Sequence, residues 1–139
     1  MSNRRNFIKK SALGTLGVSS ILGCDELNNA NIKKTYPRII STWNHGLDAN
    51  KKAWEVLKNG NGGLSAIEEG VKVSEADPKV RSVGYGGYPD REGIVTLDAC
   101  IMDKNSNCGS VSFLQNIKHP ISVARHVMED TPHVMLSGK

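Results

Sequence analysis

The sequence predicts a mixed α/β fold, in the broad sense that includes α+β, for residues 37–139. Three observations predict it. Two consecutive segments repeat apolar residues with helical spacing, two later segments rich in β-branched residues flank a short polar turn, and another helical segment precedes a short strand-like end. The expected order is strand, two helices, loop, two strands, helix and strand, as in a layered α/β domain.

The first elements are a strand and two helices. Residues 38–43 are rich in β-branched and aromatic side chains, which favours a strand. Residues 47–58 have an apolar helix face, and the glycine-rich stretch 59–63 ends that helix. Residues 64–76 repeat the helical pattern, and Pro78 follows its end.

Glu68 and Glu69 lie opposite the apolar stripe of the second helix, together with Lys72 and Glu75. A catalytic pair of carboxylates is one interpretation. Adjacent helix residues, however, point a quarter-turn or more apart, so we expect a solvated face instead.

A loop rich in glycine covers residues 82–93. It lacks the Gly-Lys-Ser/Thr ending of a phosphate-binding loop, and its glycine spacing does not fit a dinucleotide fingerprint. We therefore expect a loop that approaches a ligand closely and binds no nucleotide.

The second half predicts a hairpin, a helix and a strand. Residues 94–103 read as a largely buried strand that pairs with 108–113 across a polar turn. Pro120 suits the first turn of a helix over 121–129, and 133–136 has strand composition. The acids that flank the first strand, Asp98 and Asp103, are expected to bind backbone amides rather than to act as acid and base.

The formal charge of +4 does not indicate a nucleic-acid partner. Four basic residues, Arg4, Arg5, Lys9 and Lys10, lie in the first 24 positions, which contain no acid. Without them the 18 basic residues fall to 14, equal to the 14 acidic ones. The basic excess therefore belongs to the leader.

Residues 1–24 are predicted to be an export signal. Paired arginines followed by Phe-Ile-Lys, and then a weakly apolar stretch too short to span a bilayer, resemble the twin-arginine signal of bacteria. Ile21-Leu22-Gly23-Cys24 resembles a lipoprotein processing site, with ordinary cleavage nearby as the alternative. Residues 25–36 then form a linker, and we expect an exported, periplasmic protein, either free or lipid-anchored at Cys24.

No cofactor or metal is predicted. Cys100 and Cys108 could form a disulfide in an exported protein, but two small packed side chains are the favoured interpretation. The histidines at 119, 126 and 133 recur every seven residues, yet Pro120 and Pro132 interrupt the helix that would align them, which disfavours a metal site.

Four phrases in one order resemble the α-subunit of the glycosylasparaginase (aspartylglucosaminidase) family. They are Ser41-Thr42-Trp43-Asn44, Arg81 to Gly87, Val95 to Asp103 and Ile117 to Leu136. The resemblance implies an N-terminal-nucleophile hydrolase, built as an αββα four-layer sandwich that these residues fill only in part.

The resemblance also implies a reaction. In this family a precursor cleaves itself, and the threonine exposed at the new β-subunit N-terminus attacks the side-chain amide of asparagine linked to N-acetylglucosamine, its own amine accepting the hydroxyl proton. No threonine of this sequence has the family's His-Asp-Thr-Ile-Gly setting. We therefore expect these residues alone to be inactive, and to need the missing β-subunit half and assembly as a dimer of α/β heterodimers.

Two positions match substrate-cleft residues of the family, Trp43 and Ser82. By composition alone Trp43 would be a core residue and Ser82 a loop residue bonded to the backbone. His45 departs from the family, which has an aromatic residue there, so it could alter how the cleft contacts the sugar.

Two alternatives remain. An isoaspartyl peptidase or plant-type asparaginase shares the fold and the nucleophile, although its His-Gly-Gly-Ala-Gly loop is replaced here by Trp43-Asn44-His45-Gly46. A non-catalytic exported lipoprotein that retains half of an enzyme fold is the other.

Overall fold

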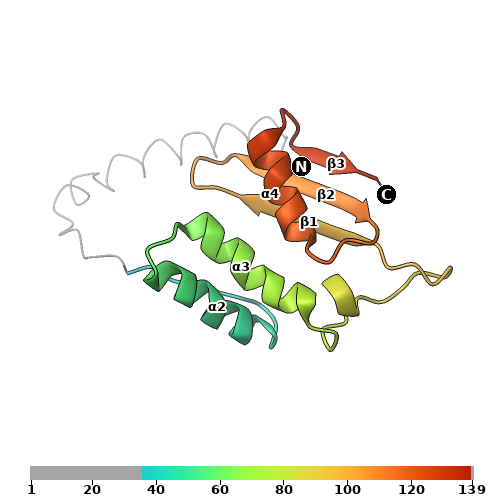
Figure 1. Ribbon diagram of the computed structural model, residues 1–139, viewed down its shortest axis with the longest axis horizontal. Helices are drawn as coiled ribbons and strands as arrows, with labels where there is room; N and C mark the ends of the chain where they lie inside the picture. The colour runs from blue at the N-terminus through green and yellow to red at the C-terminus, as the bar shows by residue number, and fades with distance from the viewer. Residues whose placement is uncertain (1–35, 139) are drawn as a thin grey trace, which may run out of the picture. The chain divides into compact units, whose positions relative to one another are not determined.

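The computed structural model describes residues 36–138. Residues 38–138 belong to one compact unit (Figure 1). The predicted export signal, Cys24 and the predicted linker up to residue 35 lie outside the described residues.

The chain is a mixed α/β structure, as predicted. The elements of the described residues are α2 Gly46–Lys58, α3 Gly63–Ala76, the 3₁₀ turn η2 Gly84–Gly86, β1 Leu97–Met102, β2 Cys108–Leu114, α4 Pro120–Asp130 and β3 Met135–Ser137. The predicted helices, the hairpin and the last short strand are confirmed. Within residues 36–138, no helix combines the length and the apolar character needed to cross a membrane.

The three strands form one sheet in the order β1-β2-β3. β1 and β2 are antiparallel, and β2 and β3 are parallel, with Ser110 opposite Met135. A parallel pair needs a crossover connection, and α4 provides it.

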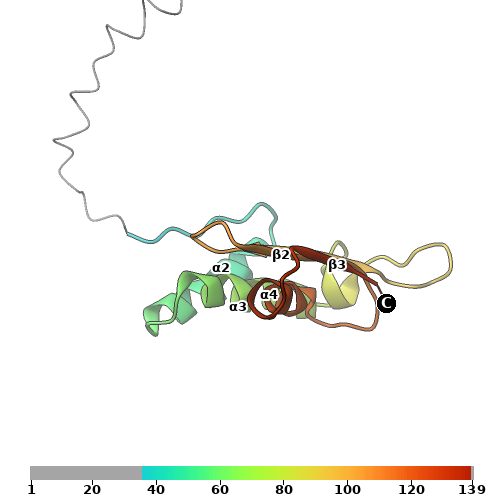
Figure 2. The ribbon, with the colours of Figure 1, turned by 90° about the horizontal axis from the view of Figure 1, so that it is seen from above.

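The helices cover one face of this sheet. Figure 2, which views the sheet along its edge, places α3 and α4 on the same side. Ile101 and Val111 of the sheet pack against Ile121, Ala124 and Val127 of α4. The approach is close, because a Cβ on Gly109 of β2 would overlap the backbone of α4 at Ala124.

The expectation that the polar side of α3 is solvated is wrong for two of its acids. Ala53 and Val56 of α2 pack against Ala66 on one side of α3, and α4 lies beside α3 on the other (Figure 1). Glu68 and Glu75 are therefore buried, with 9% and 2% of their surface exposed. Burial becomes tolerable there because α4 supplies hydrogen-bond donors.

The predicted strand at residues 38–43 is also wrong. This segment is coil, and Ile40 is 88% exposed. A β-branched composition produces a strand only where a neighbouring strand supplies hydrogen-bond partners. None of the three described strands pairs with this segment.

The strand predicted at residues 94–103 is shorter and less buried than expected. β1 begins at Leu97, and its exposure alternates along the strand, so only one face is covered. Cys100 lies on the open face and is exposed, while Cys108 is half-buried. Both thiols are free, and the expectation of a buried Cys100 is wrong because no helix within residues 36–138 covers that face.

Candidate active site

The structure brings Trp43 and Ser82 to one pocket, although they lie far apart in the sequence. The pocket has a volume of about 440 Å³, and its wall also includes His45, Val80 and Tyr88. It forms between the coil that enters α2 and the loop that follows α3. The two residues singled out by the sequence motifs are thus neighbours in space.

A hydrogen bond of the backbone, rather than packing of the side chain, fixes the position of Trp43. Its indole is 72% exposed. Its carbonyl oxygen accepts a hydrogen bond from the amide of Gly46 at 2.8 Å, which turns the chain into α2. The ring therefore borders the pocket as an apolar, accessible surface of the kind that contacts ligands.

The loop that carries Ser82 is fixed against the end of α3. Gly84 has φ +57°, and a Cβ there would overlap the backbone of Glu75. Tyr88 donates its amide to the carbonyl oxygen of Arg81 at 3.1 Å, and the Arg81 guanidinium lies 5.9 Å from the centre of the Tyr88 ring. Ser82 is exposed at the start of this loop.

Charged groups surround the same pocket. Lys79 and Arg81 supply positive charge, and Asp77 supplies negative charge. One Asp77 carboxylate oxygen accepts the amide of Lys79 at 2.8 Å, which fixes the turn after α3. The pocket wall thus combines aromatic rings with charges of both signs.

Glu75, in the last turn of α3, links this helix to the start of α4. Its carboxylate accepts the amide of Ile121 at 3.0 Å and lies 3.3 Å from Nδ1 of His119. Burial raises the pKa of Glu75 to about 7, and the hydrogen bond from Ile121 opposes this only in part. Burial is also the largest cause that lowers the pKa of His119, and the positive charges of Lys118 and Lys72 lower this pKa further. The two groups therefore favour their neutral forms.

Glu68 is buried in a different electrostatic setting. Burial alone would raise its pKa, but hydrogen bonds from Ser122, Arg125 and Lys72 together lower it to about 2. The Arg125 guanidinium donates to it at 2.8 Å and Ser122 at 2.6 Å. Glu68 is thus an ionised link between α3 and α4, and this arrangement does not support a catalytic role.

The structural interpretation of Asp98 and Asp103 is confirmed. Asp98 accepts the amide of Phe113 at 2.9 Å, where the β1–β2 register shifts and Phe113 has φ +60°. Asp103 accepts the amides of Asn105 and Asn107 in the hairpin turn at 2.8 and 2.9 Å.

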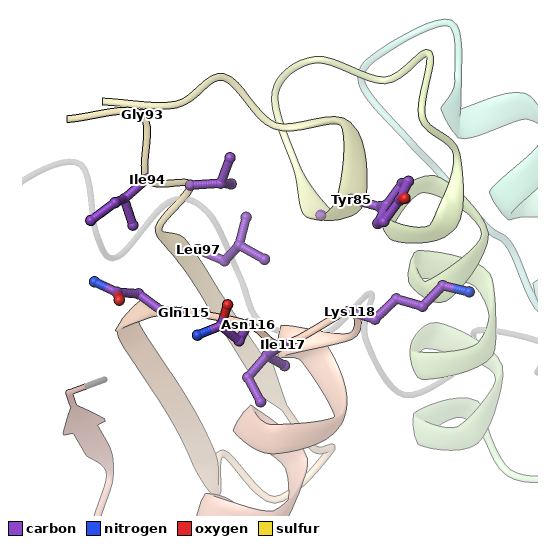
Figure 3. Close-up of a pocket in the computed structure, with 10 residues that line it drawn as sticks. Tyr85, Gly93, Ile94, Leu97, Gln115, Asn116, Ile117 and Lys118 are labelled. Carbon is purple, nitrogen blue, oxygen red and sulfur yellow. The ribbon is translucent and has the colours of Figure 1, made fainter. Parts of the chain in front are cut away.

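A second, larger pocket lies between the 84–97 segment and the β2–α4 connection. Its volume is about 720 Å³. Figure 3 shows Tyr85 and Ile94 from this segment facing Asn116 and Lys118 from the β2–α4 connection. Residues from three of the family-like phrases line it, but neither Trp43 nor Ser82 does.

The described part of the chain contains no cluster of three or more His, Cys, Asp or Glu side chains that could hold a metal ion. His119 and His126 bind carboxylates instead. His119 lies beside Glu75, and His126 Nδ1 lies 2.7 Å from Asp130.

Comparison with known proteins identifies the family. The model of the family described as Asparaginase matches residues 29–139. The chain belongs to the asparaginase family. It is similar to the N(4)-(Beta-N-acetylglucosaminyl)-L-asparaginase of Elizabethkingia miricola, with 54% identity over 140 residues. It is also similar to the enzyme with the same name from Mus musculus, with 37% identity over 131 residues.

These matches cover nearly all of this asparaginase-family chain but only part of its relatives. The match to the bacterial relative includes 99% of the chain and 41% of the relative, and the match to the mouse relative includes 94% and 37%. The chain thus spans about two fifths of the length of these curated relatives. The expected resemblance to glycosylasparaginases is confirmed.

Sequence reasoning missed two features of the site. It identified His45 as a departure from the family but did not predict its contact with Ser74 of α3, at 2.8 Å. It also placed Glu75 in solvent. The sequence shows only that Glu75 is an acidic residue shortly before the glycine-rich loop. That position is not enough to predict that its carboxyl group is buried.

Proposed function

We propose that this chain forms one wall of the active site of a hydrolase that cleaves the amide bond of N4-(β-N-acetylglucosaminyl)-L-asparagine. The observation that carries the proposal is the meeting of Trp43 and Ser82 at one pocket, in a chain whose similar relatives bear that enzyme's name. The pocket's aromatic wall and its charges of both signs support a substrate with an amino acid end.

In the proposed reaction, a threonine hydroxyl encoded after Lys139 attacks the side-chain amide carbon of the substrate. The threonine's own α-amine takes the proton, the amide C–N bond breaks, and the glycosylamine leaves with a proton. Water then hydrolyses the aspartyl ester and releases aspartate. Trp43 and Ser82 orient the substrate and the nucleophile in this scheme.

The test uses the product of the complete reading frame. We expect it to cleave itself into two polypeptides and then to hydrolyse glycosylated asparagine in preference to β-aspartyl dipeptides. Residues 1–139 alone should hydrolyse no aspartyl-anilide. A preference for β-aspartyl dipeptides would favour the isoaspartyl peptidase alternative, and the absence of both activities would favour the non-catalytic one.

Two tryptophan variants test the pocket itself. Trp43→Phe should raise KM for glycosylated asparagine about tenfold, because the smaller ring loses part of the contact area of indole. Trp54→Phe is the matched control, since Trp54 lies on α2 and is not part of the pocket wall. Equal kinetics of the two variants would contradict a role for Trp43 in binding.

We also propose that the sheet belongs to an αββα four-layer sandwich, completed by the β-subunit half, and that the mature enzyme is a dimer of α/β heterodimers. The sheet face that no described helix covers supports the first part. Sedimentation of the self-cleaved product should give the mass of two heterodimers, and the mass of one would refute the dimer.

Export to the periplasm is proposed from the leader alone, which lies outside the described residues. Replacing Arg4 and Arg5 by lysine should retain the protein in the cytoplasm, if the twin-arginine system exports it. Cys24→Ala should abolish incorporation of labelled fatty acid. If wild type incorporates none, ordinary cleavage replaces lipidation.

A further inference from the structure

The coil of residues 41–46, here called the Trp43 loop, is tied down at both of its ends. The Ser41 hydroxyl binds the side chain of Asn50, and the amide of Gly46 binds the carbonyl oxygen of Trp43 at 2.8 Å. These contacts connect the loop to α2 or to itself. None of them reaches α3 directly.

His45 supplies the connection to α3. Its Nδ1 lies 2.8 Å from Oγ of Ser74, and Ser74 is buried. Between the Trp43 loop and α3, this is the one side-chain hydrogen bond within residues 36–138. It joins the loop to the helix whose end carries the Ser82 loop, because Glu75 lies directly against Gly84.

The second ring nitrogen of His45 indicates that the residue is not optimised for stability. Nε2 is buried and has no hydrogen-bond partner among the described residues. Whichever tautomer is present, this buried atom has no partner in the part of the chain that the structure describes, and an unpaired buried polar group destabilises a fold. Residues that break a local rule of stability are concentrated at functional sites.

We propose that His45 is a positioning residue that sets substrate affinity, because its hydrogen bond to Ser74 holds the Trp43 loop against α3 and keeps the indole at the pocket that Ser82 also lines. This inference rests on the proposed function. Since Trp43 is mostly exposed, no packed neighbour can substitute for that bond. Loosening the loop should therefore weaken binding more than it slows the chemical step.

The kinetic test is a double-mutant cycle in the product of the complete reading frame. His45→Phe keeps an aromatic ring and removes both nitrogens, and Ser74→Ala removes the partner. We expect each to raise KM for glycosylated asparagine about five- to tenfold with kcat within about twofold, as the loss of one hydrogen bond predicts. The double variant should be no worse than the worse single variant, because both remove the same bond.

His45→Asn is the conservative control. Its amide reaches about the position of Nδ1, so it should recover most of the affinity, whereas His45→Phe should not. Additive effects of the two single changes would overturn the proposal. So would an unchanged KM with a lowered Tm in both, which is the signature of a purely structural role.

A second readout does not depend on activity. In the chain of residues 1–139 that carries Trp54→Phe, Trp43 is the only tryptophan, since the sequence contains two. Its fluorescence anisotropy should fall with His45→Phe and with Ser74→Ala, and unchanged anisotropy in both would overturn the proposal. If the complete product hydrolyses no glycosylated asparagine, the proposed function fails, while the anisotropy still decides whether His45 positions Trp43.

Discussion

At the scale of single residues, Glu75 connects three parts of the chain. Its carboxylate accepts the amide of Ile121 at the start of α4 and contacts His119. Its backbone lies against Gly84 of the loop that carries Ser82. A buried carboxyl group at a helix N-terminus, with a mostly neutral histidine beside it, makes the stability of this junction depend on pH.

Glu75→Gln should change that pH dependence. Burial raises the pKa of Glu75 from 4.5 to about 7, so the folded chain prefers the protonated carboxyl. Its stabilising contribution is complete below about pH 4.5 and is lost as the pH rises through about 7. The variant should therefore gain stability relative to wild type between about pH 5 and 8, by up to about 3 kcal/mol. Thermal unfolding of both proteins across this range measures it.

The other charged groups around Glu75 are Lys72, Glu68 and His119, and all three remain in both proteins. Glu69→Gln is the control, because Glu69 lies on the same helix and pairs with Lys72 at 2.8 Å. A difference between Glu75→Gln and wild type that does not vary with pH would contradict the prediction.

At the scale of elements, the close contact of η2 with the end of α3 positions the loop that carries Ser82. Gly84 permits this contact for two reasons: its φ of +57° is unfavourable for other residues, and it leaves no room for a Cβ. Gly93, in the same connection, has φ +82° but open space around it. A comparison of the two glycines therefore distinguishes the cost of backbone strain from the cost of close packing.

Gly84→Ala should destabilise the chain far more than Gly93→Ala. Backbone strain alone should cost about 1–2 kcal/mol at either position. At Gly84 the overlap with Glu75 should add about 2 kcal/mol or more, because backbone rather than a flexible side chain must move. Urea unfolding of the two variants provides the comparison, and equal losses would show that the contact is loose.

At the scale of the molecule, the described residues form a sheet covered by helices on one face. Met102 and Cys100 are exposed on the other face of β1. An open face of this kind suits the packing of a second sheet, as in the proposed sandwich.

Met102→Lys tests that arrangement. The side chain is 59% exposed, so the change should cost the chain of residues 1–139 little stability, within about 0.5 kcal/mol. In the product of the complete reading frame it should block self-cleavage, because a charge would be buried between two sheets. Ile67→Lys, at a residue of α3 that is 49% exposed, is the control. Normal self-cleavage of Met102→Lys would contradict the sandwich.

The sequence by itself determined the family, the helices, the hairpin and the turns. These depend on local patterns: helical apolar spacing in 47–58, glycines that end helices, Pro120 at a helix start, and Asp98 and Asp103 binding nearby amides. Motifs also identified Trp43 and Ser82, although not that they would share a pocket.

Only the tertiary structure decided which polar residues are buried. The spacing of Glu68 and Glu75 on α3 predicts a solvated face, but α4 covers that face and supplies Arg125, Ser122 and the amide of Ile121 as partners. In the same way, the β-branched residues at 38–43 form coil because no described strand pairs with them. Burial and strand pairing depend on segments distant in the sequence, so local composition cannot determine either.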